Sequence, residues 1–443
     1  MTFLSLLILL YLGLLLWFGL KGNTHTHGLR GLLTTGGTTG ALLCALSLVS
    51  TIIGGSATLG IGTLAQRIGS AAFWWLGVGA IGLIIHGFFI APTIRQSGAL
   101  TLPDLLGRLA GPWAEKWAAL IISISWIGIT AAQFTALHAL LVSLTGNTGI
   151  TSEVFYVALV GAIVLHTALG GQRGVIRTDA LQTILLLGGF LAAALWCIFM
   201  RTDMVASINP IPFSDKFDLP ALFKMLCLVG ITYMIGPDMF SRSFSARDGQ
   251  AARQAALIAA PLLVVFGVIV TLLALVNIDA KQPISDWLSA TSALPAPLAA
   301  ILALGLVSAL SGSADTVLLS AAGIIEKDIC GRERVSAVRF WVTGFGILAA
   351  CAAWLSGDII RLLLTAYSFF VPGVAAPMVL LVFGRLRQAH PALWLTFAVT
   401  GGLCGIAGSL TGVEMWTYAG IGIAFVGSFV AIRFAHRYAC ANV

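Results

Sequence analysis

The sequence contains little charge. Only 9% of its 443 residues are Asp, Glu, Lys or Arg, whereas 58% are hydrophobic and the mean hydropathy is +1.00. An ordinary soluble domain is about 25% charged, and a water-soluble fold of this composition would expose far more apolar surface than soluble monomers tolerate. Soluble enzymes and nucleic-acid-binding proteins are therefore excluded. The net charge of +7 indicates basic loops beside anionic lipid in an integral membrane protein.

Motifs for catalysis and metal binding are also missing. The chain has no GxSxG, HExxH or Walker lysine motif and no paired carboxylates at helical spacing. Its seven cysteines form no CxxC pair and have no partner at metal-binding spacing. We therefore expect no enzyme. The first apolar run, Phe3 to Leu20, lacks the basic segment and cleavage site of a signal peptide, so we expect it to remain as a helix.

Apolar segments long enough to cross a bilayer, about 20 residues each, fill almost the whole chain. Charged residues, Pro and Gly separate them at regular intervals. This pattern predicts an all-α polytopic membrane protein of about 13 transmembrane helices without a soluble domain. The expected spans lie near 2–20, 36–66, 70–94, 113–145, 152–170, 174–200, 220–243, 249–277, 294–325, 335–356, 359–386, 392–411 and 415–437.

The basic residues predict the orientation, because cytoplasmic loops retain Lys and Arg. With the N-terminus outside, 18 of the 24 basic residues, Arg242 among them, are on the cytoplasmic side. The outer side then holds only Arg67, Arg201, Lys216, Lys224, Lys281 and Arg361. We expect a multi-pass protein of the plasma membrane (cell inner membrane) with its N-terminus outside and its C-terminus cytoplasmic.

Two expected spans are irregular. Gly54, Gly55, Gly60 and Gly62 lie within the second, and Gly236-Pro237 lies late in the seventh. Such residues either allow close helix packing or interrupt a helix so that freed backbone oxygens line a site. If helices 2–6 and 7–11 are inverted repeats, the two irregular helices correspond, which indicates a transport site near the midplane.

Ionisable residues deep in the expected spans are few. Asp315 shares its helix face with Ser308, Ser311 and Gly312. This oxygen-rich strip suits Na⁺, although Ser and Gly also serve helix packing. Asp179 lies in an early turn of its helix beside Arg173 and Arg177, where a helix cap or an ion pair also explains it. We expect His86, His138 and His166 to be hydrogen-bonded packing residues.

Four motifs resemble the sodium/solute symporter family. The most specific runs from Thr167 through Gly170-Gly171 to Thr178-Asp-Ala-Leu-Gln182. The others, in the family's order, are Thr101-Leu-Pro-Asp-Leu-Leu106, Ser245-Ala-Arg-Asp248, and Ser313-Ala-Asp-Thr-Val-Leu-Leu319 leading to Glu326-Lys-Asp-Ile329. The resemblance covers nearly the whole chain.

This resemblance implies the leucine-transporter type of fold, with two inverted five-helix repeats (helices 2–6 and 7–11) and flanking helices. The expected divisions are 1–35, 36–200, 201–390 and 391–443. The implied function is sodium-coupled symport of a small organic solute by alternating access. The alternatives are a proton-coupled or uncoupled transporter and a transporter-derived solute sensor. We expect Na⁺ as coupling ion, the solute and the lipid bilayer as partners, no nucleic acid, and a monomer.

The resemblance also implies site residues. The family's sodium site uses backbone oxygens at Ser50 and Ile53 together with Ala309, Gly312 and Ser313, where Gly312 departs from the family by lacking a hydroxyl. Water, Ser311 or Asp315 is expected to complete the ion's shell. Asp179 and Asp315 are candidates for a second ion site or an exit path. The expected substrate residues are Gly54, Gly55, Ser56, Ala57, Trp126, Gln133, Tyr233 and Tyr367.

The sequence gives little on the substrate. It places no Arg within the membrane that would favour a carboxylate, and no polar cluster that would favour a sugar. We expect recognition of an amino or hydroxyl group on a small, mostly neutral molecule.

Overall fold

The computed structural model describes residues 2–23, 28–145, 149–200, 202–206, 208–276, 294–355, 359–383 and 386–441. Within these residues every regular element is a helix, and strand-like pairing is limited to two isolated bridges, Thr39 with Ala246 and Ser214 with Phe217. The predicted all-α fold is confirmed. Arg201 and Lys281, used above for the orientation, lie outside the described residues.

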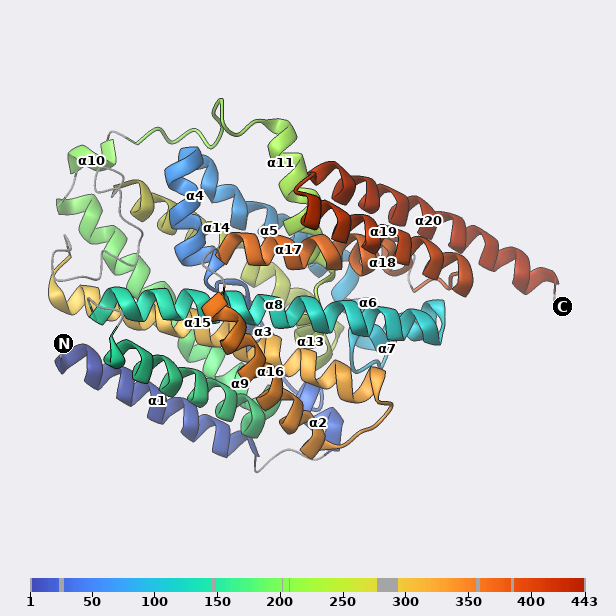
Figure 1. The fold of residues 1–443 in the computed structure, drawn as a ribbon, viewed down its shortest axis with the longest axis horizontal. Helices are drawn as coiled ribbons and strands as arrows, with labels where there is room; N and C mark the ends of the chain where they lie inside the picture. The colour runs from blue at the N-terminus through green and yellow to red at the C-terminus, as the bar shows by residue number, and fades with distance from the viewer. Residues whose placement is uncertain are drawn as a thin grey trace.

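The helices follow one another along the chain as shown in Figure 1. Their bounds are α1 (Thr2–Asn23), α2 (Gly28–Thr34), α3 (Ala41–Ile52), η1 (Ser56–Gly60), α4 (Ile61–Ile68), η2 (Gly69–Phe73), α5 (Trp74–Ile85), η3 (His86–Ile90), α6 (Ala91–Gln96), α7 (Leu102–Ala110), α8 (Pro112–Thr145), α9 (Ile150–Met200), α10 (Thr202–Ala206), α11 (Leu219–Met225), η4 (Leu226–Gly230), α12 (Ile231–Ile235), α13 (Pro237–Ser245), α14 (Gly249–Val276), α15 (Ala296–Ile324), η7 (Ile325–Ile329), α16 (Val335–Leu355), α17 (Ile359–Phe370), η8 (Val371–Ala375), α18 (Ala376–Phe383), α19 (Pro391–Thr411) and α20 (Glu414–Ala441).

Ten helical segments of the described chain are long and apolar enough to span a membrane, and Leu6–Gly22 and Ala41–Ile52 are shorter apolar helices. The count of thirteen spans stays a prediction, because two expected spans are joined in α9. The expected break between them is present as a kink at Gly171, whose φ of 54° is easy only for glycine. A Cβ atom there would lie 2.5 Å from the Leu32 side chain, so glycine also allows the close approach of α2.

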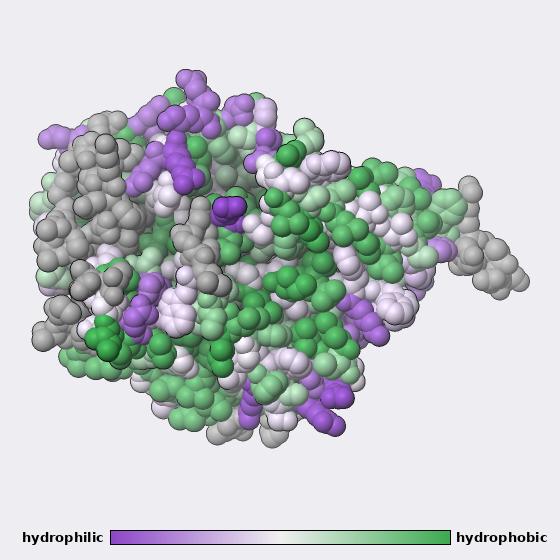
Figure 2. All heavy atoms as spheres, in the orientation of Figure 1, coloured by the Kyte–Doolittle hydropathy of each residue, from purple (hydrophilic) through white to green (hydrophobic). Residues whose placement is uncertain are grey.

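The outer surface of the helices is largely apolar. Leu6, Trp17, Phe88, Phe199 and Val265 are each about half exposed or more. Figure 2 shows hydrophobic residues over much of the visible face, with hydrophilic residues gathered mainly in patches near its edges. An apolar exterior of this extent is the surface that lipid tails cover.

The long helix α15 lies at the centre and packs against α9, α8, α3 and α16. The helix α14 covers α3 and α5, and α1 packs along α9. Small residues bring α1 and α9 together, because a Cβ atom at Gly22 would lie 2.6 Å from the carbonyl oxygen of Gly170. The hairpin of α19 and α20 packs against η8 and α18 and extends toward the right of Figure 1.

Two helices are interrupted where the sequence places its glycines. The helix α3 ends at Ile52 and η1 begins at Ser56. Likewise α12 ends at Ile235 and α13 begins at Pro237, with Gly236 between them in an extended conformation (ψ 142°). The interruption near Gly54 and Gly55 is therefore confirmed over the alternative of a straight span that uses its glycines for packing alone.

Candidate ion and solute site

The interruption of α3 lies against α8 and α15. The amide N–H of Gly55 donates to Oε1 of Gln133 at 2.6 Å, so a side chain of α8 satisfies a backbone group that the broken helix leaves over. A Cβ atom at Gly54 would lie 2.8 Å from Oγ of Ser313 and would also collide with Gln133. Only glycine permits this approach, which places Ser313 directly beside the break.

The predicted sodium residues lie on these two facing segments. Ser50, Ile53, Ala309 and Ser313 are all buried. The Gly54 N–H donates to the carbonyl of Ile52 at 3.1 Å and not to that of Ser50, four residues back. The break therefore frees a carbonyl oxygen near α15, and backbone and hydroxyl oxygens are ligands that a hard cation prefers. The donor set fits Na⁺.

The missing hydroxyl at Gly312 is compensated by oxygens from other helices. A Cβ atom at Gly312 would collide with Oγ of Ser50 and would lie 2.5 Å from Oε1 of Gln182 and 3.2 Å from Oδ1 of Asp179. These three oxygens fill the space that a serine side chain would need. Oδ1 of Asp179 has no hydrogen-bond partner among the described residues, which is consistent with a cation as its partner.

Asp179 is paired with Arg242, not with Arg173 or Arg177. Nη2 of Arg242 donates to Oδ2 of Asp179 at 3.0 Å, and both side chains are at most 1% exposed. Ser47 Oγ donates to the same carboxylate oxygen at 2.5 Å. The helix-cap interpretation of Asp179 is replaced by a buried ion pair, which costs much less than a lone buried charge.

Arg242 corrects one expectation. It is a fully buried member of α13 inside the expected span 220–243, and thus an arginine within the membrane, where the sequence reasoning placed none. Its guanidinium also donates to Ser47 at 2.9 Å, to Thr51 at 2.6 Å and to Thr316 at 2.5 Å. We call Asp179, Arg242, Ser47, Thr51 and Thr316 the buried cluster. Nε and Nη2 of Arg242 are thus committed to the cluster, whereas Nη1 has no hydrogen-bond partner among the described residues.

Asp315 and His166 face each other beside this cluster. Their Oδ2 and Nε2 atoms are 3.7 Å apart and both side chains are at most 1% exposed. Nδ1 of His166 lies 2.8 Å from the carbonyl oxygen of Leu15, and Nε2 lies 3.2 Å from Oγ1 of Thr178. His166 thus joins α1 to α9, as expected of a hydrogen-bonded packing residue. His86 likewise contacts Met234 and Ser243, each at 2.9 Å.

Ser311 is directed away from the break, toward α1. It is hydrogen-bonded to the hydroxyl of Tyr11, and Nε2 of Gln182 donates to Ser311 at 3.3 Å and to Tyr11 at 2.8 Å. Ser311 is thus committed to α1 and α9, whereas Ser50 and Gln182 supply the oxygens at Gly312. The sequence around Tyr11 does not indicate these hydrogen bonds, because the partners Gln182 and Ser311 are far away in the chain.

A pocket lies between the two interrupted helices, α8, α15 and α17. Five of the eight predicted substrate residues line it: Ser56, Trp126, Gln133, Tyr233 and Tyr367. Ser313 lines it too, so the candidate ion site adjoins the cavity. The other three do not line it: Gly54 and Gly55 approach the Gln133 side chain, and Ala57 is fully buried. We call this cavity the solute pocket.

The charged residue of this lining was missed by the sequence reasoning. Asp238 follows directly after the second interruption, and its Oδ1 accepts from Nε1 of Trp126 at 2.9 Å and from Ser320 at 3.4 Å. The Gly236-Pro237 break was a usable signal, because the first residues after an interruption point toward the site.

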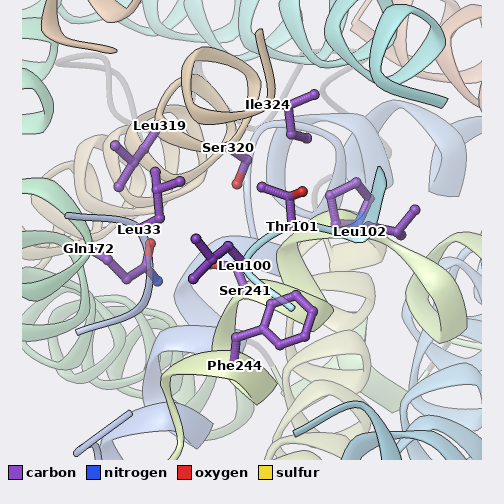
Figure 3. A pocket seen from close by; sticks show the side chains of 11 residues that line it. Leu33, Leu100, Thr101, Leu102, Gln172, Ser241, Phe244, Leu319, Ser320 and Ile324 are labelled. Carbon is purple, nitrogen blue, oxygen red and sulfur yellow. The ribbon is translucent and has the colours of Figure 1, made fainter. Parts of the chain in front are cut away.

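A second pocket is lined by Pro237 and by Ser320, the residue that donates to Asp238. Figure 3 shows Leu319, Ser320 and Ile324 of α15 on one side of it and Ser241 and Phe244 of α13 on the other. Thr101 from one of the family motifs also lines it.

Two of the motifs meet next to this cavity. Oγ1 of Thr101 donates to Asp328 at 2.7 Å. Nζ of Lys327 is 3.0 Å from Asp328, 3.3 Å from Asp104 and 3.8 Å from Glu115. We call Lys327 and these three acids the Lys327 cluster. Motifs more than 200 residues apart in the chain are thus joined at one end of the helix bundle.

The chain is similar to known cation-coupled transporters. No family model matches it. It is 24% identical over 349 residues to the sodium/pantothenate symporter of Haemophilus influenzae, an alignment that covers 74% of this chain and 65% of that relative, less than two thirds of its length.

The fold is shared with solved transporters. A Na⁺-coupled sialic acid symporter superposes with a TM-score of 0.78 over 97% of this chain and 98% of that one, at 15% identity. MHP1, a nucleobase-cation-symport-1 family transporter, gives 0.62 over 94% and 96%, at 13% identity. MhsT in complex with L-phenylalanine gives 0.60 over 88% and 97%, at 13% identity. The resemblance that the motifs predicted is confirmed, and the chain has the leucine-transporter type of fold.

Proposed function

We propose that the protein is a sodium-coupled symporter that imports a small organic solute by alternating access. The observation that carries this proposal is the interrupted α3 facing α15, where the candidate sodium residues and the solute pocket share Ser313. An ion bound there stabilises the wall of the solute pocket, which is the physical basis for coupling. The similarity to symporters named for sodium supports the same conclusion.

The proposal includes the arrangement in the membrane. The protein acts as a monomer in the plasma membrane, with its N-terminus outside and its C-terminus cytoplasmic. Residues 36–200 and 201–390 form the inverted repeats, and the two interrupted helices begin them. Figure 1 supports opposite sides for the two ends, since α1 begins at the left of the bundle and α20 ends at the right.

A second candidate is solute transport without sodium. It is favoured by the missing hydroxyl at Gly312 and by Arg242, which already supplies Asp179 with a positive charge. In that case the Arg242 guanidinium supplies the positive charge beside Asp179 that a transported Na⁺ would otherwise supply.

Uptake by proteoliposomes distinguishes the candidates. A labelled panel of small amines, alcohols and acids is offered with an inward Na⁺ gradient, and again with K⁺ in place of Na⁺. A symporter accumulates one compound only with the Na⁺ gradient. Counterflow that is equal in both salts supports the uncoupled transporter, and no flux of any compound contradicts a transport function.

A further inference from the structure

Among the described residues that line the solute pocket, one is charged, and that residue is an acid. Asp238 is only 8% exposed, and its fellow lining residues are neutral polar, aromatic or aliphatic. A carboxylate within a membrane-spanning bundle is costly unless a partner compensates it. The identity of its partner is therefore informative about what the pocket holds.

The described residues supply Asp238 with hydrogen bonds but with no ion pair. Both of its bonds, from Trp126 and Ser320, go to Oδ1. Oδ2 accepts no hydrogen bond among the described residues. Arg242 lies one helical turn further along α13, but its hydrogen bonds there go to Ser47, Thr51, Asp179 and Thr316. Arg242 thus acts on Asp238 only through space.

Aromatic rings complete the pocket around this carboxylate. Trp126, Tyr233 and Tyr367 all line it, and the Trp126 ring is held edge-on against Phe370 at 4.9 Å between centroids. Aromatic faces attract organic cations, most strongly where water is excluded. Thr232 and Gln133 add neutral hydrogen-bonding groups to the lining.

We propose that the transported solute is a small organic cation whose ammonium group pairs with Asp238 between Trp126, Tyr233 and Tyr367. This inference rests on the proposed transport function and names its substrate class. It replaces the expectation of a mostly neutral molecule. A solute whose recognised group is a carboxylate is disfavoured, because its charge would face Asp238 without a basic partner in the lining.

Three probes of matched size test the charge preference: phenethylamine, which is cationic at neutral pH, 2-phenylethanol, which is neutral, and 3-phenylpropionate, which is anionic. Binding to the purified protein is measured by calorimetry in NaCl. We expect phenethylamine to bind at least about tenfold more tightly than the alcohol, and the acid to bind weakest. Binding of the amine that is no tighter than that of the alcohol, including no binding of either, overturns the inference.

The variant Asp238→Asn removes the charge and keeps an oxygen that can accept from Trp126. We expect amine binding to weaken by about thirtyfold and the preference over the alcohol to disappear, whereas Asp238→Glu restores the preference in part. Asp248→Asn is the matched control. Asp248 lies outside the candidate spans, where the Ala251 amide donates to it at 2.7 Å and holds its pKa below the usual range. A preference that survives in Asp238→Asn overturns the inference.

Thermal stabilisation by Na⁺ relative to K⁺, measured on the same samples, separates this inference from the coupling mechanism. If the amine preference and its loss in Asp238→Asn are observed without any sodium effect, the cation site is supported and sodium coupling is wrong. If Na⁺ stabilises the protein and the amine shows no preference, the coupling is supported and the cation site is wrong.

Discussion

The buried cluster and the Lys327 cluster both pair a basic side chain with acids, but they do so in different surroundings. Asp179 and Arg242 are at most 1% exposed. In the Lys327 cluster, Lys327 is 15% exposed and Glu115 26% exposed. A charge without water must have its partner, whereas a partly hydrated charge keeps much of its solvation when a partner is lost. The comparison therefore predicts very different consequences for the same kind of mutation.

The clusters also differ in what they leave unpaired. Asp179 Oδ1, Arg242 Nη1 and the nearby Asp315 Oδ2 have no hydrogen-bond partner among the described residues. Asp179 Oδ1 and Asp315 Oδ2 are thus oxygens that a bound cation could contact. In the Lys327 cluster the lysine contacts all three of its acids. We infer that the buried cluster serves the ion site and that the Lys327 cluster fastens the end of the bundle.

The largest expected effect follows from removing Arg242. The variant Arg242→Leu leaves Asp179 buried without its cation and should lower the free energy of unfolding by about 3–5 kcal/mol. Thermal unfolding in detergent measures this, with Arg247→Leu as control, because Arg247 pairs with Asp248 at an exposed site. Equal transition temperatures for the two variants would show that the Asp179–Arg242 pair contributes nothing.

The double variant Asp179→Leu with Arg242→Leu sharpens this test. Replacing both charges removes the unpaired carboxylate, so much of the lost stability should return. Because the carboxylate that we place at the ion site is also gone, the recovered protein should respond less to Na⁺. A double variant as unstable as the sum of its single variants would contradict the pairing.

Gly55→Leu should have a smaller effect on stability and a large one on the site. A Cβ atom there would already lie 2.7 Å from Ala136 and 3.1 Å from Leu310, so overpacking should cost about 1–3 kcal/mol and abolish uptake. Gly161→Leu is the control, because no atom lies within 4 Å of a Cβ at that position. Normal uptake by Gly55→Leu would remove the interruption from the transport mechanism.

In the Lys327 cluster, Lys327→Ala should cost only about 1–2 kcal/mol, because Asp104 and Glu115 are partly hydrated and Thr101 still donates to the buried Asp328. The smallest effect is expected for the exposed pair of Lys224 and Glu414, which are 3.3 Å apart. Lys224→Ala should change the free energy of unfolding by less than about 0.5 kcal/mol. Both are measured by thermal unfolding. A Lys327→Ala variant as unstable as Arg242→Leu would erase the distinction between the two clusters.

The sequence predicted those parts of the fold that depend on local pattern. Apolar runs predicted the helices, and Gly54, Gly55 and Gly236 predicted the interruptions, because glycine content acts on the backbone where it occurs. The substrate residues on helices beside the interruptions followed from the family resemblance, and five of them line one cavity.

The buried cluster could not be predicted in the same way. Arg242 lies at the end of the expected span 220–243, so the sequence counted it among the basic residues of the cytoplasmic side, and its partner Asp179 is 63 residues away in the chain. Asp238 was overlooked for a related reason: its significance depends on Trp126 of α8, 112 residues away. A single sequence shows that such residues are present but not which of them meet.

The central claim, that the interrupted α3 and α15 hold a sodium ion, is tested most directly by the unfolding temperature of the purified protein as NaCl replaces KCl at constant ionic strength. We predict a rise that grows with the logarithm of the Na⁺ concentration above the dissociation constant, since an ion that binds only the folded state stabilises it by about 2.7 kcal/mol at one hundred times its dissociation constant. In Ser313→Ala, which removes one oxygen beside Gly54, the same rise should need about tenfold more Na⁺. Unfolding temperatures that are equal in NaCl and KCl, in both the parent and the variant, would contradict the sodium site.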